Sequence, residues 1–190
     1  MSVRAFSRML IAFGAMAMAM LGVTVAAPSA AAAVPGPQAA LVCYDVSNAG
    51  PFVGYAHEAA AIWNNSTNNV DLANCGPNLV VYYTYGGGSY AVRYSLGVGY
   101  VVIDVYQAQQ YSPLRIVAHE MGHILGLADN YNGDCSLLMS GGSAGTACTN
   151  PYPRSDEAAL VDYYFGGARA ETVGAEVFRD SWPAKVAAAN

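Results

Sequence analysis

The sequence around residues 112–126 constrains the fold more than any other part of the chain. Ser112 is a good N-cap for a helix, and Pro113 suits the first helical position, where its missing N–H costs nothing. Gly126 is a natural helix end, because only glycine enters the left-handed conformation without strain. Together these signals predict a helix whose two ends are both defined by the local sequence.

Two of the three histidines of the chain lie on this predicted helix, at positions His119 and His123. Residues four apart project from one helix face, so both imidazoles could bind one metal ion at about 2.0–2.1 Å, the usual zinc–nitrogen distance. Glu120 would point beside such an ion rather than at it, and could take a proton from a water on the zinc. The pattern therefore predicts a zinc site with a neighbouring base.

Two imidazoles need a third ligand, with a fourth position left open for water. Gly126 would let the chain reverse after His123, and Asp129 follows where the reversed chain could face the metal again. The full string is H-E-x-x-H-x-x-G-x-x-D, which is much more specific than H-E-x-x-H alone. The alternative is that the histidines are ordinary helix residues and that Asp129 forms a turn.

The chain has four cysteines, an even count that fits two disulfides in three possible pairings. We favour Cys135–Cys148, which closes a short Gly/Ser-rich loop and should contribute about 3 kcal/mol, together with Cys43–Cys75. The alternative is a zinc site made of four thiolates, which is disfavoured because the chain contains no C-x-x-C pair.

The N-terminal segment has the three parts of an export signal. Two arginines precede an uncharged run over residues 9–27, and small residues follow. This pattern predicts a secretory signal peptide over residues 1–33 and a short spacer over 34–40. A membrane anchor is the alternative, but the glycines and alanines make the run only moderately hydrophobic. We therefore expect a secreted, extracellular protein.

The charge of the chain excludes several classes of partner. Its net charge is −5, and the part beyond the predicted signal has six basic against 13 acidic residues, with Lys185 as the only lysine. No basic patch can be built from so few cations, so we expect no nucleic acid and no membrane as partners after signal cleavage. An apolar content of 54% with 11% charged residues excludes a disordered chain.

Hydrophobic periodicity predicts alternating strands and helices in the remaining chain, and hence a mixed α/β domain. The helix over 155–165 should begin with Ser155 as its cap. Loops are expected over 64–78 and 129–153. The predicted strands are 41–46, 79–85, 90–96 and 99–106, and the predicted helices are 53–64, 112–126 and 155–165.

The string from His119 to Asp129, with Asp in place of a third His, resembles the snapalysins, which are small secreted neutral zinc endopeptidases of the metzincin type. The resemblance extends to Tyr131 and to Cys135 and Cys148, which are spaced as in that family's disulfide. It also includes the segment 138–141, Leu-Met-Ser-Gly, which is similar to the methionine turn beneath the metal.

The resemblance implies an α/β (α+β) fold with a metzincin-like twisted mixed sheet, an active-site helix, a C-terminal helix and a cleft with zinc at its floor. It implies a zinc metallopeptidase catalytic domain over residues 41–167, followed by a C-terminal extension over 168–190. The implied activity is hydrolysis of peptide bonds within proteins, with a preference for an aromatic residue just after the scissile bond (P1′). We expect a monomer.

The family's roles carry over position by position. His119, His123 and Asp129 would hold one zinc ion per chain, and Glu120 would be the general base. Tyr131 would hydrogen-bond the zinc water or the developing oxyanion, although it could instead be a packed loop tyrosine. Met139 would form a hydrophobic floor under the imidazoles.

Two features near the site are left open by the resemblance. Some snapalysins bind calcium near the start of this helix, but residues 110–115 contain no acidic side chain, which argues against calcium here. Residues 90–96 could form an edge strand that pairs with an extended substrate, although strand propensity in a half-buried sheet is the simpler explanation of its tyrosines.

Other functions remain as alternatives. A zinc amidase or peptidase acting on cell-wall peptides would use the same residues. A secreted protein that binds zinc without catalysis would need a site closed by four protein ligands, and the sequence offers three. Catalysis based on serine or cysteine is disfavoured, because His57 is the only histidine left to serve as a base.

Overall fold

The computed structural model describes residues 38–168 and 174–179 of the chain. The predicted signal peptide over 1–33 and most of the spacer lie outside the described residues. Among those that are described, no helix is long and apolar enough to cross a membrane.

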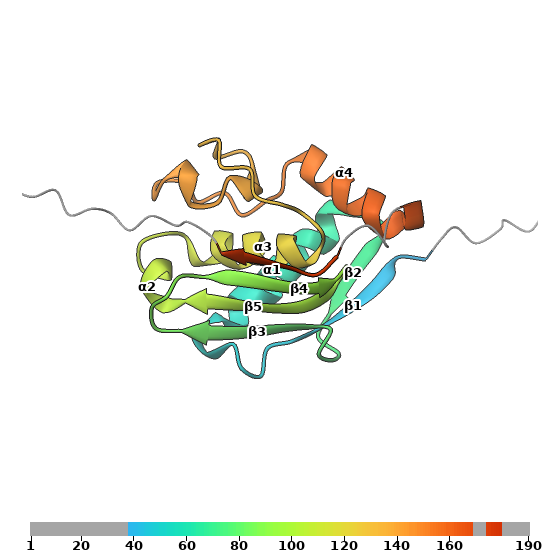
Figure 1. Ribbon diagram of the computed structural model, residues 1–190, viewed down its shortest axis with the longest axis horizontal. Helices are drawn as coiled ribbons and strands as arrows, with labels where there is room; N and C mark the ends of the chain where they lie inside the picture. The colour runs from blue at the N-terminus through green and yellow to red at the C-terminus, as the bar shows by residue number, and fades with distance from the viewer. Residues whose placement is uncertain (1–37, 169–173, 180–190) are drawn as a thin grey trace, which may run out of the picture. The chain divides into compact units, whose positions relative to one another are not determined.

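The described strands form one mixed sheet (Figure 1). Its strand order is β2-β1-β3-β5-β4-β6. Strands β2, β1, β3 and β5 run parallel to one another, whereas β4 is antiparallel to both β5 and β6. The strands are β1 (Ala40–Asp45), β2 (Val70–Ala73), β3 (Leu79–Thr84), β4 (Tyr90–Ser95), β5 (Val98–Asp104) and β6 (Glu176–Arg179).

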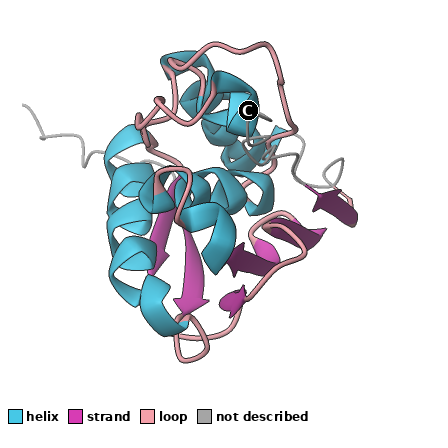
Figure 2. Cartoon of the chain, turned by 90° about the vertical axis from the view of Figure 1, so that its left-hand side faces the viewer, coloured by secondary structure: helices cyan, strands magenta, loops and turns pink. Residues whose placement is uncertain are grey.

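The long helices lie together beside the sheet (Figure 2). Helices α1 and α3 contact each other, and α3 also packs against β4 and β5. The α-helices are α1 (Val53–Ser66), α2 (Val105–Ala108), α3 (Pro113–Ile124) and α4 (Ser155–Tyr163). Shorter helical turns are η1 (Gly50–Phe52), η2 (Leu138–Ala144) and η3 (Tyr164–Ala168).

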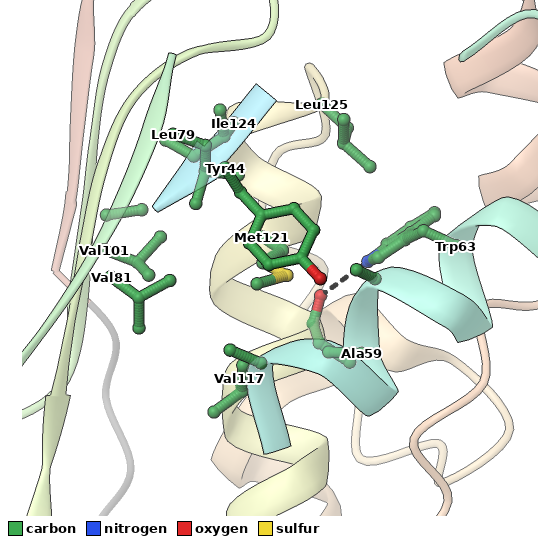
Figure 3. Close-up of a cluster of buried hydrophobic side chains, with 14 of the residues drawn as sticks. Tyr44, Ala59, Trp63, Leu79, Val81, Val101, Val117, Met121, Ile124 and Leu125 are labelled. Carbon is green, nitrogen blue, oxygen red and sulfur yellow. Dashed lines mark hydrogen bonds between the residues drawn. The ribbon is translucent and has the colours of Figure 1, made fainter. Parts of the chain in front are cut away.

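The hydrophobic core fills the space between the sheet and helices α1 and α3 (Figure 3). Trp63 on α1 is fully buried, and its indole N–H donates to the carbonyl of Ala118 on α3 at 3.0 Å. Met121 and Ile124 project from α3 into the same core. Because burying each such side chain contributes about 1.5–3 kcal/mol, α3 is fixed against the sheet by its apolar face.

The predicted α/β class, with a mixed sheet and packed helices, is confirmed. The loop predicted over 64–78 is wrong at β2, whose four residues carry too little alternation to stand out from polar neighbours. The strand predicted to continue to Tyr106 ends at Asp104, because the Asp104 carboxylate accepts from the Tyr106 N–H and starts α2.

The edge position considered for residues 90–96 is not what the structure shows. Strand β4 pairs with β6 on its outer side, so β6 lies at this end of the described sheet. The pairing is non-local and joins segments more than 80 residues apart, which no local pattern can indicate. The domain boundaries at 41–167 and 168–190 remain a prediction, although β6 of the expected extension is part of the sheet.

Candidate metal centre

Helix α3 places His119 and His123 on one face, as predicted. It begins at Pro113, and the Ser112 hydroxyl accepts from the backbone N–H of Arg115 at 3.4 Å. Both histidines and Glu120 are fully buried. These three side chains therefore lie on a helix whose residues are mostly buried rather than on a surface loop.

Each imidazole is oriented by a backbone carbonyl. The Nδ1 atom of His119 lies 3.0 Å from the Leu138 carbonyl oxygen, and Nδ1 of His123 lies 3.0 Å from that of Leu127. A carbonyl can only accept, so each Nδ1 carries the proton and each Nε2 presents a lone pair. This is the arrangement in which outer contacts prepare histidines to bind a metal through Nε2.

Asp129 completes a triangle of ligand atoms. Its Oδ1 lies 3.3 Å from Nε2 of His119 and 3.5 Å from Nε2 of His123, and the two Nε2 atoms are 3.2 Å apart. Four ligands placed tetrahedrally at about 2.0–2.1 Å from zinc would be about 3.3–3.4 Å from one another. Three acceptor atoms at such distances repel each other unless a cation lies between them, so these residues fit a tetrahedrally bound metal ion.

The turn at Gly126 brings Asp129 back to the helix. Gly126 has a φ of +109°, and a Cβ there would lie 2.7 Å from the Tyr164 ring. The Leu127 N–H donates to the Gly122 carbonyl at 3.0 Å, which closes the turn. Glycine is therefore required by both backbone conformation and space.

Tyr131 lies near His119. A Cβ added at Gly141 would lie 3.0 Å from the Tyr131 ring and 3.1 Å from the His119 ring. Both rings thus approach one glycine, whose φ is +52°. Tyr131 is 42% exposed, so it also contacts solvent.

Met139 lies next to α3. It is 2% exposed, and a Cβ added at Gly122 would lie 2.9 Å from its Sδ atom. The helix residue between the two histidines is therefore in close contact with the thioether. Its role as a floor beneath the site remains a prediction.

Two charged residues that hold the loop side of the site were missed from the sequence. Arg115 is 1% exposed, and its guanidinium donates to the carbonyl oxygens of Leu137, Leu138 and Asn150 and to the Ser140 hydroxyl. Burial lowers the pKa of Arg115 from its ordinary value, and the charge of Glu157 opposes that shift. The sequence did offer a signal for this residue, because Arg115 lies one turn before His119 on the same helix face.

Glu157 is the second missed residue. Its carboxylate accepts from the backbone N–H groups of Leu138 and Met139 at 2.9 and 2.8 Å. It also accepts from the N–H of Arg154 at 2.7 Å, and Arg154 rather than Ser155 stands at the N-cap position of α4. The cap predicted at Ser155 is therefore wrong, because Glu157 reaches back to satisfy the first turn.

The structure joins Cys43 to Cys75 and Cys135 to Cys148, the pairing favoured from the sequence. The second disulfide lies in the loop that leads from Asp129 to α4. The remaining histidine, His57, lies apart from the cluster on α1, where its Nδ1 is 2.7 Å from the Tyr44 hydroxyl. Among the described residues, His119, His123 and Asp129 form the only group suited to a metal ion.

Comparison with known proteins agrees with this geometry. The mixed sheet with α3 packed against it is the α/β fold of metzincin-like peptidases. The family model described as the Streptomyces extracellular neutral proteinase (M7) family matches residues 39–167. The chain belongs to this family, and the resemblance to snapalysins is confirmed.

Three relatives share the name extracellular small neutral protease. The one from Streptomyces lividans is 46% identical over 138 residues, covering 71% of this chain and 58% of its own length. The one from Streptomyces caespitosus is 48% identical over 124 residues, covering 64% and 93%. The one from Streptomyces coelicolor is 43% identical over 143 residues, covering 74% and 66%. The aligned region thus spans little more than half of the Streptomyces lividans protein.

Proposed function

We propose that this chain is a secreted zinc-dependent endopeptidase that hydrolyses peptide bonds of proteins. The observation that carries the proposal is the triangle of His119 Nε2, His123 Nε2 and Asp129 Oδ1, with sides of 3.2–3.5 Å. Membership of an extracellular proteinase family supports both the reaction and the location. Proteins or peptides are the substrates, and neither nucleic acid nor a membrane is a partner.

Zinc bound to these three residues would polarise the substrate carbonyl and lower the pKa of an attacking water to about 7. Glu120 accepts the proton of that water and then delivers it to the leaving amine. Its burial on α3 keeps the carboxylate in a fixed orientation and in low dielectric surroundings.

Tyr131 donates a hydrogen bond to the oxyanion that develops on the substrate. Its contact with Gly141 beside the His119 ring supports this role. Met139 holds the histidine-bearing helix from below and donates no ligand. One zinc ion per chain, a monomeric enzyme and a preference for an aromatic residue at P1′ complete the proposal.

Three protein ligands favour catalysis over a structural role. A structural zinc site is closed by four protein ligands, and a catalytic one leaves a position for water. Within residues 38–168 and 174–179, the group suited to a metal contains three residues. The geometry thus supports an enzyme rather than a binding protein.

Casein cleavage with and without a zinc chelator tests the function. We expect cleavage by the purified protein, loss of cleavage with 1,10-phenanthroline, and recovery when zinc is added back. Cleavage that persists in the chelator would refute metal dependence. Hydrolysis of cell-wall peptides without any cleavage of casein would refute the proposed substrate class.

A further inference from the structure

The chain's own strand β6 lies alongside β4 next to the metal cluster. Figure 1 shows it as the red arrow beside β4 and α3. The antiparallel register places Phe178 opposite Ala91 and Glu176 opposite Arg93. Because opposite residues of a strand pair share a face, Phe178 and Glu176 lie on the same side of the sheet as the buried Ala91 and Arg93.

Phe178 contacts a proposed metal ligand directly. Its ring stacks on the His123 imidazole, with 4.1 Å between ring centroids and 9° between the planes. Phe178 is only 6% exposed, whereas its neighbour Val177 is 54% exposed. The short strand therefore directs one aromatic side chain into the site and leaves the preceding residue in solvent.

Arg93 of β4 links this strand to the active-site helix. Its guanidinium donates to the His123 carbonyl at 2.6 Å, to the Gly174 carbonyl at 3.2 Å and to the Glu176 carboxylate at 3.0 Å. The same guanidinium lies 4.7 Å from the centre of the Phe178 ring. One buried cation on the helix side thus recognises both an acidic and an aromatic side chain of an extended segment.

An extended peptide can bind a strand edge in the same way that a strand of the protein does. Without β6, the outer edge of β4 would present its backbone groups next to His123. We propose that residues 174–179 occupy the place of an extended peptide substrate, so that the C-terminal segment inhibits the enzyme in cis. The proposal rests on the proposed function, and it also names a substrate feature, an acidic residue two positions before an aromatic one.

The expected size of the inhibition follows from the attachment of β6 to the same chain as the site. A short linker gives an attached strand an effective concentration on the order of 1 mM. A hexapeptide that binds with a dissociation constant of roughly 0.1 mM would then leave about one site in ten open to substrate. Release of β6 should therefore raise kcat/KM for a peptide substrate about 10-fold.

The first test compares two full-length variants on a quenched fluorescent peptide. Phe178→Ala removes the ring that contacts His123 and should raise kcat/KM about 10-fold, mainly through a lower KM. Val177→Thr is the matched control, because this exposed side chain faces away from the site, and its kcat/KM should equal that of wild type. An unchanged or lower kcat/KM in Phe178→Ala, with zinc content retained, would overturn the proposal.

A binding measurement separates this inference from the proposed function. A labelled peptide with the sequence of residues 174–179 is titrated into two proteins that also carry Glu120→Gln, which prevents cleavage of the probe. It should bind the Phe178→Ala protein about 10-fold more tightly than the protein with Phe178, as read by fluorescence anisotropy. Equal affinities would overturn the proposal whether or not the wild-type chain is a peptidase.

Discussion

The candidate site has two halves that are held in different ways. His119 and His123 belong to α3, whose apolar face is packed against the sheet and α1. Asp129 and Met139 belong to the segment after Gly126, where two buried charged side chains, Arg115 and Glu157, satisfy the backbone groups of the loop. The helix half depends on hydrophobic burial, and the loop half depends on a few hydrogen bonds to charged groups.

This difference separates two kinds of failure. Damage to the helix half should unfold the domain or remove the metal altogether. Loss of the hydrogen bonds between Arg115 or Glu157 and the loop half should move Asp129 while leaving the two imidazoles in place. The metal would then be held by two ligands and bound more weakly, although the fold would persist.

Removal of one ligand from each half gives the largest expected effect. His119→Ala and Asp129→Ala should each lower kcat/KM by more than about 10³-fold, because both leave two ligands for the metal. Zinc content after dialysis and circular dichroism are the readouts. Full metal occupancy in Asp129→Ala would remove that residue from the ligand set and leave the loop half without a role in binding.

Glu120→Gln changes the helix half without changing a ligand. We expect zinc content to stay at the wild-type level and kcat to fall by about 10²–10⁴-fold, because the amide cannot accept a proton. Steady-state kinetics with metal analysis of the same sample measures both. Substantial residual turnover would refute the assignment of the base.

Glu157→Gln changes the loop half alone. The amide places an N–H₂ group where the carboxylate accepts from the backbone N–H groups of Leu138, Met139 and Arg154, so at least one of these donors loses its partner. We expect a loss of about 1–3 kcal/mol in the free energy of unfolding. Zinc affinity should fall by about 10–100-fold, as for other outer contacts of metal ligands. Urea denaturation and competition with a zinc indicator measure the two effects.

Asp156→Asn is the control for that variant and has the smallest expected effect. A hydrogen bond from the Arg154 side chain lowers the pKa of Asp156 to about 2. The carboxylate is exposed to solvent, so the change should cost less than about 0.5 kcal/mol at pH 7. Because the folded pKa is depressed, this contribution is present above the unfolded pKa of about 3.9 and is lost as the pH falls through about 2. An effect at pH 7 as large as that of Glu157→Gln would contradict the contrast between the two residues.

The sequence predicted the helix half more completely than the loop half. Ser112 and Gly126 act locally, so both ends of α3 and the shared face of its histidines could be inferred from spacing alone. The position of Met139 came only through a family resemblance, because the shape of its loop depends on Glu157, far along the chain.

The pairing of β4 with β6 was not predicted. Four residues of β6 carry no recognisable alternation, and their place is set by contacts of Phe178 and Glu176 with residues more than 80 positions earlier. Burial of Arg115 was missed for a similar reason, since its partners are backbone carbonyls that only the folded loop brings together. Long-range polar contacts are the part of the site that local patterns do not encode.

X-ray absorption at the zinc edge of the loaded wild-type protein tests the central claim most directly. The account predicts one zinc ion per chain, two imidazole nitrogens and further oxygen ligands at about 2.0–2.1 Å, with no sulfur. It also predicts that Asp129→Ala changes this spectrum or abolishes binding. A wild-type protein that binds no zinc, or a sulfur ligand in the first coordination sphere, would contradict it.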